Sequence, residues 1–400
     1  MLRAQFLVAL PLFLVAAACS SQEGDARQEN AGSVKQPEAW SPRDNPSLFT
    51  SNLEKHLSNL PKNGEAAKIP WAGSYWPTYK DGINYRWDGA DSDSPAKKYE
   101  VAFGRSGVED AVSRTSGVDA HSNRRSCTKD SQCDYSQGEA CAKRDGESRG
   151  RCIPTWFGIC HAWAPAAILA PEPQHDVVKN GVTFHVQDIK ALASLLHEAV
   201  TTKFVSLRCN QEEDNMDPDE YGRPRSDCRD TNPGTLHILL ANYIGIRKQS
   251  FVEDRTYDYQ VWNQPLRGYK VLSTKTVTSQ EANALVVGDS ENAPSGYLFN
   301  PKATTFMHVK TEVKYITESG PDEGNLSSRI DEYTRGSRYE YVLELDAAGE
   351  IIGGEWVGRS KSDHPDFLWL PVRQSGATVA GGAISADEVN ELVKLSVAAE

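Results

Sequence analysis

The residues best suited to chemistry are a cysteine, a histidine and a carboxylate that lie far apart in the chain. Cys160 follows the glycine-containing turn 156–159 and begins the apolar, alanine-rich run 160–170, which predicts a buried helix. The unpaired N–H groups and the dipole at a helix N-terminus stabilise a thiolate, which is the nucleophilic form of cysteine. The alternative is a buried structural cysteine without a chemical role.

A nucleophilic cysteine needs a general base and a group that orients the base. His237 lies in the run 232–245, which has the Asn-Pro start and glycine end of a helix. Asp254 follows a predicted strand at 246–252, and a nearby carboxylate raises the basicity of a buried imidazole. The alternative for His237 is a core histidine with a structural partner.

Two other histidines stay open as the base. His308 lies on the alternating run 305–316, which predicts a strand, and Glu344 or Asp346 could orient it. His364 is the third candidate.

The eight cysteines divide into groups by their surroundings. Four of them lie in the polar segment 120–153, where two disulfides are expected in any of three pairings: Cys127, Cys133, Cys141 and Cys152. Their spacing is too wide for a typical zinc site. Cys209 and Cys228 are expected to pair, which leaves Cys160 single.

The first residues are typical of export. Residues 1–18 have a charged start, a short apolar run and small residues before Cys19, the pattern of a bacterial lipoprotein signal. Cleavage there would leave a lipid on Cys19 and anchor the protein, by prediction, in the outer membrane of a Gram-negative bacterium; cleavage as an ordinary secretory signal is the alternative. Residues 19–45 are polar and predict a disordered tether. Residues 46–400 are predicted to form the catalytic region, interrupted by the insert 120–153.

The net charge bears on the partners of the protein, and the hydrophobic periodicity predicts its helices and strands. The formal net charge of −12 argues against nucleic acid as a partner. The acidic stretch 212–220 could hold calcium, but its spacing does not fit an EF-hand, and a solvated loop is favoured. Helices are predicted at 46–60, 187–198, 232–245 and 384–398, and a hairpin at 339–357.

Several motifs together resemble the transglutaminase elicitor family, in which this chain would be a bacterial lipoprotein member. The run 261–271, Val-Trp-Asn-Gln-Pro-Leu-Arg-Gly-Tyr-Lys-Val, closely resembles the peptide elicitor of the family's oomycete cell-wall enzymes. The stretches 75–87, 160–165, 352–356 and 364–369 resemble the same family.

The resemblance implies an α+β fold with a papain-like or transglutaminase-like core, made of a helical half with the cysteine and a twisted antiparallel sheet. It implies a protein-glutamine γ-glutamyltransferase that joins glutamine to lysine through a thioester on Cys160, with Trp156 or Trp163 shielding the thioester from water. The superfamily order Cys, His, Asp gives Cys160, His237 and Asp254 as the catalytic residues. The superfamily histidine lies on a strand, however, whereas His237 is predicted to be helical.

The sequence requires no cofactor, and the resemblance allows calcium. Two other functions stay open. A cysteine hydrolase, either a protease or a peptidoglycan amidase, would use the same residues with water as acceptor. An inactive surface binding protein would keep the scaffold without the chemistry.

Overall fold

The structure is a computed structural model that describes residues 42–210, 231–288, 295–321, 324–374 and 376–398. Within these ranges no helix has the length and apolar character needed to cross a membrane. The α-helices are α1 (Pro95–Ala102), α2 (Val108–Ser116), α3 (Cys160–Leu169), α4 (Val186–Leu195), α5 (Pro233–Leu239), α6 (Ser279–Val287) and α7 (Ala386–Val397). A π-helical segment, η9 (Leu240–Ile246), continues α5.

The largest sheet has eight strands, and all of its pairings are antiparallel. Its strand order is β12 (Ile351–Trp356), β11 (Thr334–Leu345), β10 (Thr305–Ile316), β9 (Asn263–Val277), β8 (Val252–Asp254), β13 (Leu368–Arg373) and β7 (Thr201–Val205), with β1 (Asn63–Glu65) also paired to β9. The smaller sheets are formed by β2 (Ser126–Cys127), β3 (Glu139–Ala142) and β4 (Gly150–Pro154), by β5 (Val177–Lys179) and β6 (Val182–Phe184), and by β14 (Thr378–Val379) and β15 (Ile384–Ser385).

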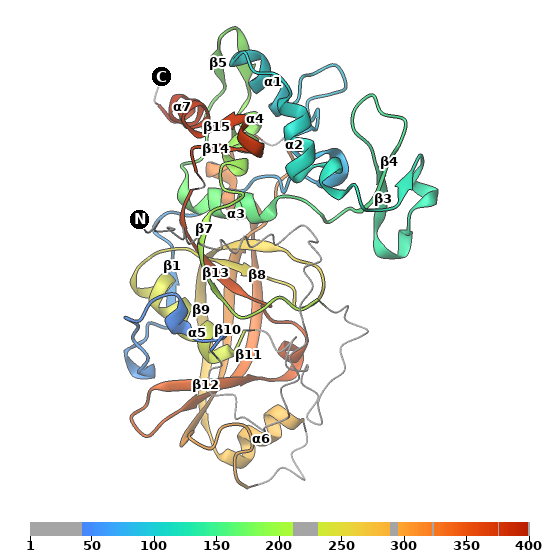
Figure 1. The fold of residues 1–400 in the computed structure, drawn as a ribbon. Coiled ribbons are helices and arrows are strands. Elements are labelled where there is room, and N and C mark those ends of the chain that lie inside the picture. The colour runs from blue at the N-terminus through green and yellow to red at the C-terminus, as the bar shows by residue number, and fades with distance from the viewer. Residues whose placement is uncertain (1–41, 211–230, 289–294, 322–323, 375, 399–400) are drawn as a thin grey trace, which may run out of the picture.

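The helices gather mainly at one end of this sheet. In Figure 1, α1, α2, α4 and α7 lie above the sheet, and α3 lies between them and the upper ends of the strands. Helix α3 packs against α4 on one side and against β9 and β13 on the other. Helix α5 instead packs against β11 and β12, beside the lower half of the sheet (Figure 1). The predicted combination of a helical half with an antiparallel sheet is therefore confirmed.

Most predicted elements are present, with two exceptions. The strand predicted at 246–252 is wrong, because the π-helical segment η9 extends to Ile246 and β8 begins only at Val252. Helices α3, α4, α5 and α7 and strands β10, β11 and β12 occupy their predicted stretches. The helix predicted at 46–60 is wrong, because the segment contains only two short 3₁₀ turns, Pro46–Leu48 and Leu57–Asn59. Its backbone pairs instead with the first residue of β12 and with the turn before it, through Ile351 N–H to Lys55 O and Leu57 N–H to Gly349 O. These tertiary hydrogen bonds outweigh the local helical pattern of leucines.

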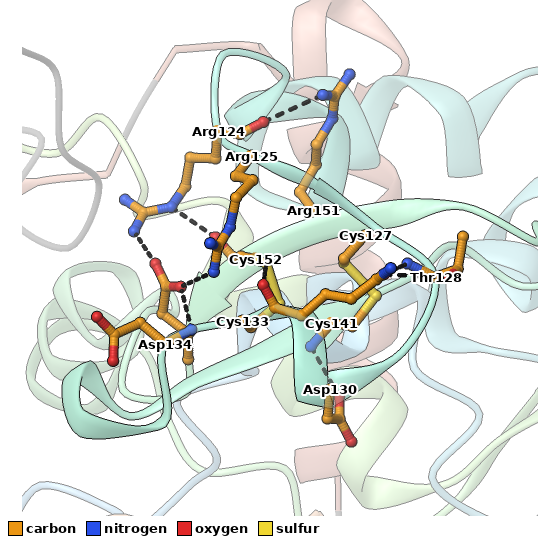
Figure 2. The surroundings of a disulfide bond; sticks show 12 residues. Arg124, Arg125, Cys127, Thr128, Asp130, Cys133, Asp134, Cys141, Arg151 and Cys152 are labelled. Carbon is orange, nitrogen blue, oxygen red and sulfur yellow. Dashed lines mark hydrogen bonds and ion pairs between the residues drawn. A yellow bond between two sulfur atoms is a disulfide. The ribbon is translucent and has the colours of Figure 1, made fainter.

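The segment 120–153 contains the two predicted disulfides, and the structure selects one of the three pairings. Cys127 bonds Cys141, and Cys133 bonds Cys152. Figure 2 shows both bonds beside the small sheet of β2, β4 and β3, with Arg124 and Arg125 next to them. Covalent bonds thus hold a segment that has little apolar core of its own.

Candidate active site

The backbone before α3 fixes where the cysteine lies. The Ile159 N–H donates to Tyr75 O at 2.7 Å, so the turn before the helix is tied to the aromatic segment 75–87. Gly158 is needed there, because a Cβ atom at this position would lie 2.5 Å from Tyr75 O. Helix α3 then begins at Cys160, and Ile159 offers no side-chain cap to its first N–H groups. This is the predicted position of Cys160 at a helix N-terminus.

The Cys160 sulfur lies in a polar contact that the sequence did not reveal. Asn263 Nδ2 lies 3.5 Å from Cys160 Sγ, and the Oδ1 atom of Asn263 accepts from Trp369 Nε1 at 2.7 Å. Since the oxygen is held by Trp369, the amide orientation with Nδ2 towards the sulfur is fixed. Val261 O lies 3.8 Å from Sγ and can accept from a reduced thiol. The Cys160 side chain is only 1 % exposed.

The oxidation state of Cys160 differs from the prediction. The sulfur of Cys160 takes part in a disulfide, so the expectation that this cysteine is single is wrong for this state of the molecule. Cys209 is also disulfide-bonded, whereas its predicted partner Cys228, like Cys19, lies outside the described residues. Spacing along a chain does not determine which cysteines meet in space. Nucleophilic chemistry at Cys160 requires the reduced thiol.

Asp254 lies next to Asn263, at the end of β8. The two residues are directly opposite each other in the β8–β9 ladder. Asp254 Oδ1 accepts from Trp262 N–H at 2.8 Å and from Thr256 Oγ1 at 3.1 Å. Its Oδ2 atom is buried and has no hydrogen-bond partner among the described residues. Burial raises the pKa of Asp254 to about 8, against the effect of these hydrogen bonds, so the carboxyl holds a proton near neutral pH.

His237 is not brought together with Asp254 or Cys160. Its Nδ1 atom forms a hydrogen bond of 2.9 Å with the Tyr341 hydroxyl, which also bonds Thr311 Oγ1 at 2.8 Å. Burial lowers the pKa of His237 to about 4, so the ring is neutral at physiological pH. These contacts lie where α5 meets β11. They correspond to the alternative of a core histidine with a structural partner.

The other candidate histidines also have local partners. His308 Nε2 lies 2.7 Å from Glu340 Oε1, rather than beside Glu344, which bonds Tyr297 and Asn300. Asp346, the other orienter considered, accepts from the backbone N–H groups of the turn that follows it. His364 Nδ1 donates to Ser360 O at 2.7 Å, and its ring stacks on Trp356.

His161 follows Cys160 in α3 and is also buried. Burial lowers the pKa of His161 to about 4, and its Nδ1 has no hydrogen-bond partner among the described residues.

No group of three carboxylates close enough to share a calcium ion occurs among the described residues. Only two groups of three close His, Cys, Asp or Glu side chains occur in this part of the chain: Cys127, Cys133 and Cys141, and Cys133, Glu139 and Cys152. Their sulfur atoms are already joined in disulfides, and calcium prefers several oxygen ligands. The acidic stretch 212–220 lies outside the described residues.

Comparison with known proteins identifies the family of this chain and a solved structure with a similar fold. The sequence model of the family described as Transglutaminase elicitor matches residues 44–399, and the chain belongs to this family. The structure is similar to the crystal structure of the GP42 transglutaminase from Phytophthora sojae, with 41 % sequence identity and a TM-score of 0.75. The match covers 88 % of this chain and 95 % of the GP42 chain. No curated protein matches the sequence.

Two residues of this site, Asn263 and Trp369, were not predicted from the sequence. Both lie inside the motifs that resemble the family, at 261–271 and 364–369. An asparagine and a tryptophan separated by about a hundred residues carry no pairing signal of their own.

Proposed function

We propose that the chain is a cysteine-dependent protein-glutamine γ-glutamyltransferase that forms isopeptide bonds between glutamine and lysine side chains. The observation that carries the proposal is the buried Cys160 sulfur at the N-terminus of α3, with the Asn263 amide directed at it, in a member of the Transglutaminase elicitor family. The proposed catalytic residues are Cys160 as nucleophile and Asp254 as the carboxyl group that lies opposite Asn263 in the β8–β9 ladder. His237 was predicted as the base, but its contact with Tyr341 supports a structural role.

The reaction begins with the reduced thiol. The Cys160 thiolate attacks the γ-carboxamide carbon of a protein glutamine, a C–S bond forms, the C–N bond breaks, and ammonia leaves after taking up a proton. A lysine amine then attacks the thioester, a new C–N bond forms, and the C–S bond breaks. The amine loses a proton, and the thiol is regenerated.

Both steps pass through a tetrahedral oxyanion beside the Cys160 sulfur. The N–H groups at the start of α3 and the Asn263 Nδ2 group are suitable donors, because an oxyanion hole requires donors held in place before charge develops. Trp369 keeps the Asn263 amide in one orientation. A protonated Asp254 next to Asn263 adds no negative charge that would oppose the oxyanion.

Burial of the sulfur favours amine over water as the acceptor. Cys160 belongs to an apolar cluster that includes Trp71, Trp163 and Trp369. Such surroundings exclude water from a thioester and so reduce hydrolysis. A cysteine hydrolase would use the same residues with water as the acceptor, so the identity of the product separates the two functions.

We further propose that the enzyme acts outside the cytoplasm, attached to the outer membrane by a lipid on Cys19. The lipoprotein-like sequence 1–19 and the disulfides Cys127–Cys141 and Cys133–Cys152 support this, since disulfides persist in oxidising compartments. Metabolic labelling with a palmitate analogue should mark the wild-type protein and not the Cys19→Ala variant. Equal labelling of both proteins would contradict the anchor.

The proposed function is tested by amine incorporation. The reduced wild-type protein should incorporate dansylcadaverine into dimethylated casein and release ammonia in equal amounts. Cys160→Ala should incorporate none while keeping the circular dichroism spectrum and the unfolding midpoint of the reduced wild type, in which Cys160 is a thiol rather than part of a disulfide. Full activity of this variant, or ammonia release without amine incorporation, would contradict the proposal.

A further inference from the structure

A buried ion pair joins α4 to the segment that follows α3. Lys190 Nζ lies 2.6 Å from Glu172 Oε1, and the Lys190 side chain is completely buried. The ammonium group also donates to Ala72 O at 2.9 Å and to Gly324 O at 3.1 Å. Its three N–H groups are therefore all used, by acceptors from three separate stretches of the chain.

Glu172 adds further connections to the ion pair. Its Oε1 atom accepts from the Leu326 N–H at 3.0 Å, and its Oε2 atom accepts from Ser327 Oγ at 2.5 Å. Two side chains thus connect α4, the segment after α3, the stretch 71–73 and the stretch 324–327. Because a buried ion pair often adds no net stability over apolar residues, we looked for what this pair positions.

The ion pair fixes Trp71 and the backbone that follows it. Lys190 Nζ lies 5.4 Å from the centre of the Trp71 ring, and Trp71 Nε1 donates at 3.2 Å to Ala170 O, at the end of α3. A Cβ atom at Gly73 would lie 2.7 Å from the Trp71 ring and 2.8 Å from the Trp163 ring. The backbone next to the Lys190 contact therefore packs directly on Trp163.

Trp163 connects this backbone to the candidate nucleophile. It lies three positions after Cys160 in α3, so the two side chains share a face of the helix. Both belong to one cluster of buried apolar side chains, and the ion pair bonds the backbone of two other members, Ala72 and Leu326. The ion pair therefore holds part of the packing around Cys160.

A surface hollow lies on the outer side of this packing. It has a volume of about 350 Å³, and its lining includes Trp71, Glu172 and Ile330. Trp71 also belongs to the cluster that contains Cys160, and Ile330 packs against that cluster. A displacement of Trp71 would therefore open a path for water from the hollow towards the cluster.

We propose that the Lys190–Glu172 pair positions the packing around Cys160 so that the thioester reacts with an amine rather than with water. The proposal rests on the proposed function, because the thioester is the intermediate of that reaction. Water that reaches the thioester forms a C–O bond as the C–S bond breaks, and it gives one proton to the sulfur. The products are then a glutamate side chain and the thiol. Lys190 and Glu172 act through Trp71 and the backbone at 72–73, as positioning residues.

The choice between the two acceptors tests the proposal. Reduced protein is given dimethylated casein and dansylcadaverine, and ammonia release is compared with amine incorporation in the same sample. Lys190→Met should raise the ratio of ammonia to incorporated amine from near one to about two or more, because hydrolysis releases ammonia without incorporating amine. A mere loss of folded protein would lower both quantities and leave their ratio unchanged.

A double variant keeps the test valid if Lys190→Met does not fold. Lys190→Met/Glu172→Gln leaves no unpaired buried charge and retains an acceptor for the Leu326 N–H. It still removes the donor to Ala72 O and the charge beside Trp71. It should therefore raise the ratio as Lys190→Met does.

Lys98 supplies the matched control. It forms another buried ion pair with α4, through Asp188, and its ammonium group lies 5.9 Å from the centre of the Trp87 ring. Trp87 packs against a different apolar cluster, which does not contain Cys160. Lys98→Met therefore removes the same kind of contact from the same helix, and it should lower stability without changing the ratio.

Alkylation of Cys160 gives a measurement that needs no turnover. The reduced protein is treated with iodoacetamide, and mass spectrometry follows the modification of this residue. The rate should be about threefold or more higher in both Lys190 variants than in the wild type, because a buried thiol reacts from locally opened states. Lys98→Met should react at the wild-type rate.

The outcomes separate this proposal from the proposed function. An unchanged ratio in both Lys190 variants overturns the positioning role even if the wild type incorporates amine. An equal rise of the ratio in Lys98→Met also overturns it. If the wild type incorporates no amine, the acyl transfer is contradicted and the alkylation rates decide on the ion pair. Faster alkylation in the Lys190 variants then supports its role in the packing around Cys160, and equal rates overturn that role.

Discussion

Asn263 directs its side-chain amide at the sulfur of Cys160, with 3.5 Å between Nδ2 and Sγ. The two residues lie on elements that are far apart in the sequence, the first position of β9 and the first position of α3. The antiparallel ladder puts Asp254 opposite Asn263. The contact between α3 and the sheet therefore brings an amide donor to the cysteine, with a carboxyl group on the neighbouring strand.

Replacement of Asn263 by Asp should slow catalysis without removing the bond from Trp369. Aspartate can still accept from Trp369 Nε1, but it has no N–H group for the thiolate or the oxyanion. We expect kcat to fall by about 100-fold, the usual effect of losing one oxyanion donor. The pKa of the Cys160 thiol should rise, which the pH dependence of alkylation by iodoacetamide measures.

Trp369→Phe is the companion variant, because it keeps the Asn263 amide and removes the hydrogen bond from Trp369 Nε1 that holds the amide in one orientation. It should reduce kcat less than Asn263→Asp does. An unchanged alkylation profile and unchanged kcat in both variants would show that Asn263 has no part in the chemistry.

Replacement of His237 by Gln distinguishes a base from a structural histidine. Its Nδ1 contact with Tyr341 predicts a loss of about 1–3 kcal/mol in the free energy of unfolding, because a buried hydroxyl loses a well-placed partner. The turnover per folded molecule should change little. Urea unfolding and a double-mutant cycle with Tyr341→Phe measure the coupling between the two side chains.

The opposite pattern would restore His237 as the base. In that case His237→Gln would abolish turnover and leave stability near that of the wild type. His308→Gln and His364→Gln, assayed in parallel, test the other two histidines for the same pattern.

The redox state of Cys160 should control activity. Because Cys160 is disulfide-bonded in the structure, protein isolated without reductant should show little amine incorporation, and mild reduction should restore it. The gain should follow the appearance of a thiol that the Cys160→Ala variant lacks in a thiol titration. Full activity in protein without a titratable thiol would contradict a Cys160 nucleophile.

Glu253 should make stability depend on pH. Both of its carboxylate oxygens are buried without a hydrogen-bond partner among the described residues, and burial raises its pKa to about 8. The folded state therefore keeps a proton that the unfolded state loses above pH ~4.3, and stability falls as the pH rises towards 8. Glu253→Gln should remove part of this slope and be more stable than the wild type at pH 8 by about 2 kcal/mol.

The pH dependence of Glu253→Gln is interpreted with a second buried carboxyl group and a control variant. Asp254, with its pKa also raised to about 8, contributes a slope of the same sign, so the slope should be reduced and not abolished. The exposed Glu350 gives a matched control, and Glu350→Gln should leave the pH profile unchanged. A Glu253→Gln profile parallel to that of the wild type would contradict the burial of a protonated Glu253.

Local pattern was sufficient for most of the fold. The alternation at 305–316 and the turn at 347–350 predicted β10 and the β11–β12 hairpin, because one face of each strand must pack on a core. The helix starting at Cys160 followed from the glycine turn and the apolar run after it. The helix predicted at 46–60 failed because the leucine spacing could not reveal hydrogen bonds to a turn about 300 residues away.

The sequence by itself determined the family, the nucleophile candidate and its place at a helix start, since these depend on residue types over short stretches. Only the tertiary structure decided what meets Cys160: Asn263 and Trp369 come from two strands of the sheet, and His237 is held by Tyr341 elsewhere. It also selected the pairing of the four cysteines in the insert. Contacts of this kind depend on strand register and helix packing, which no local spacing encodes.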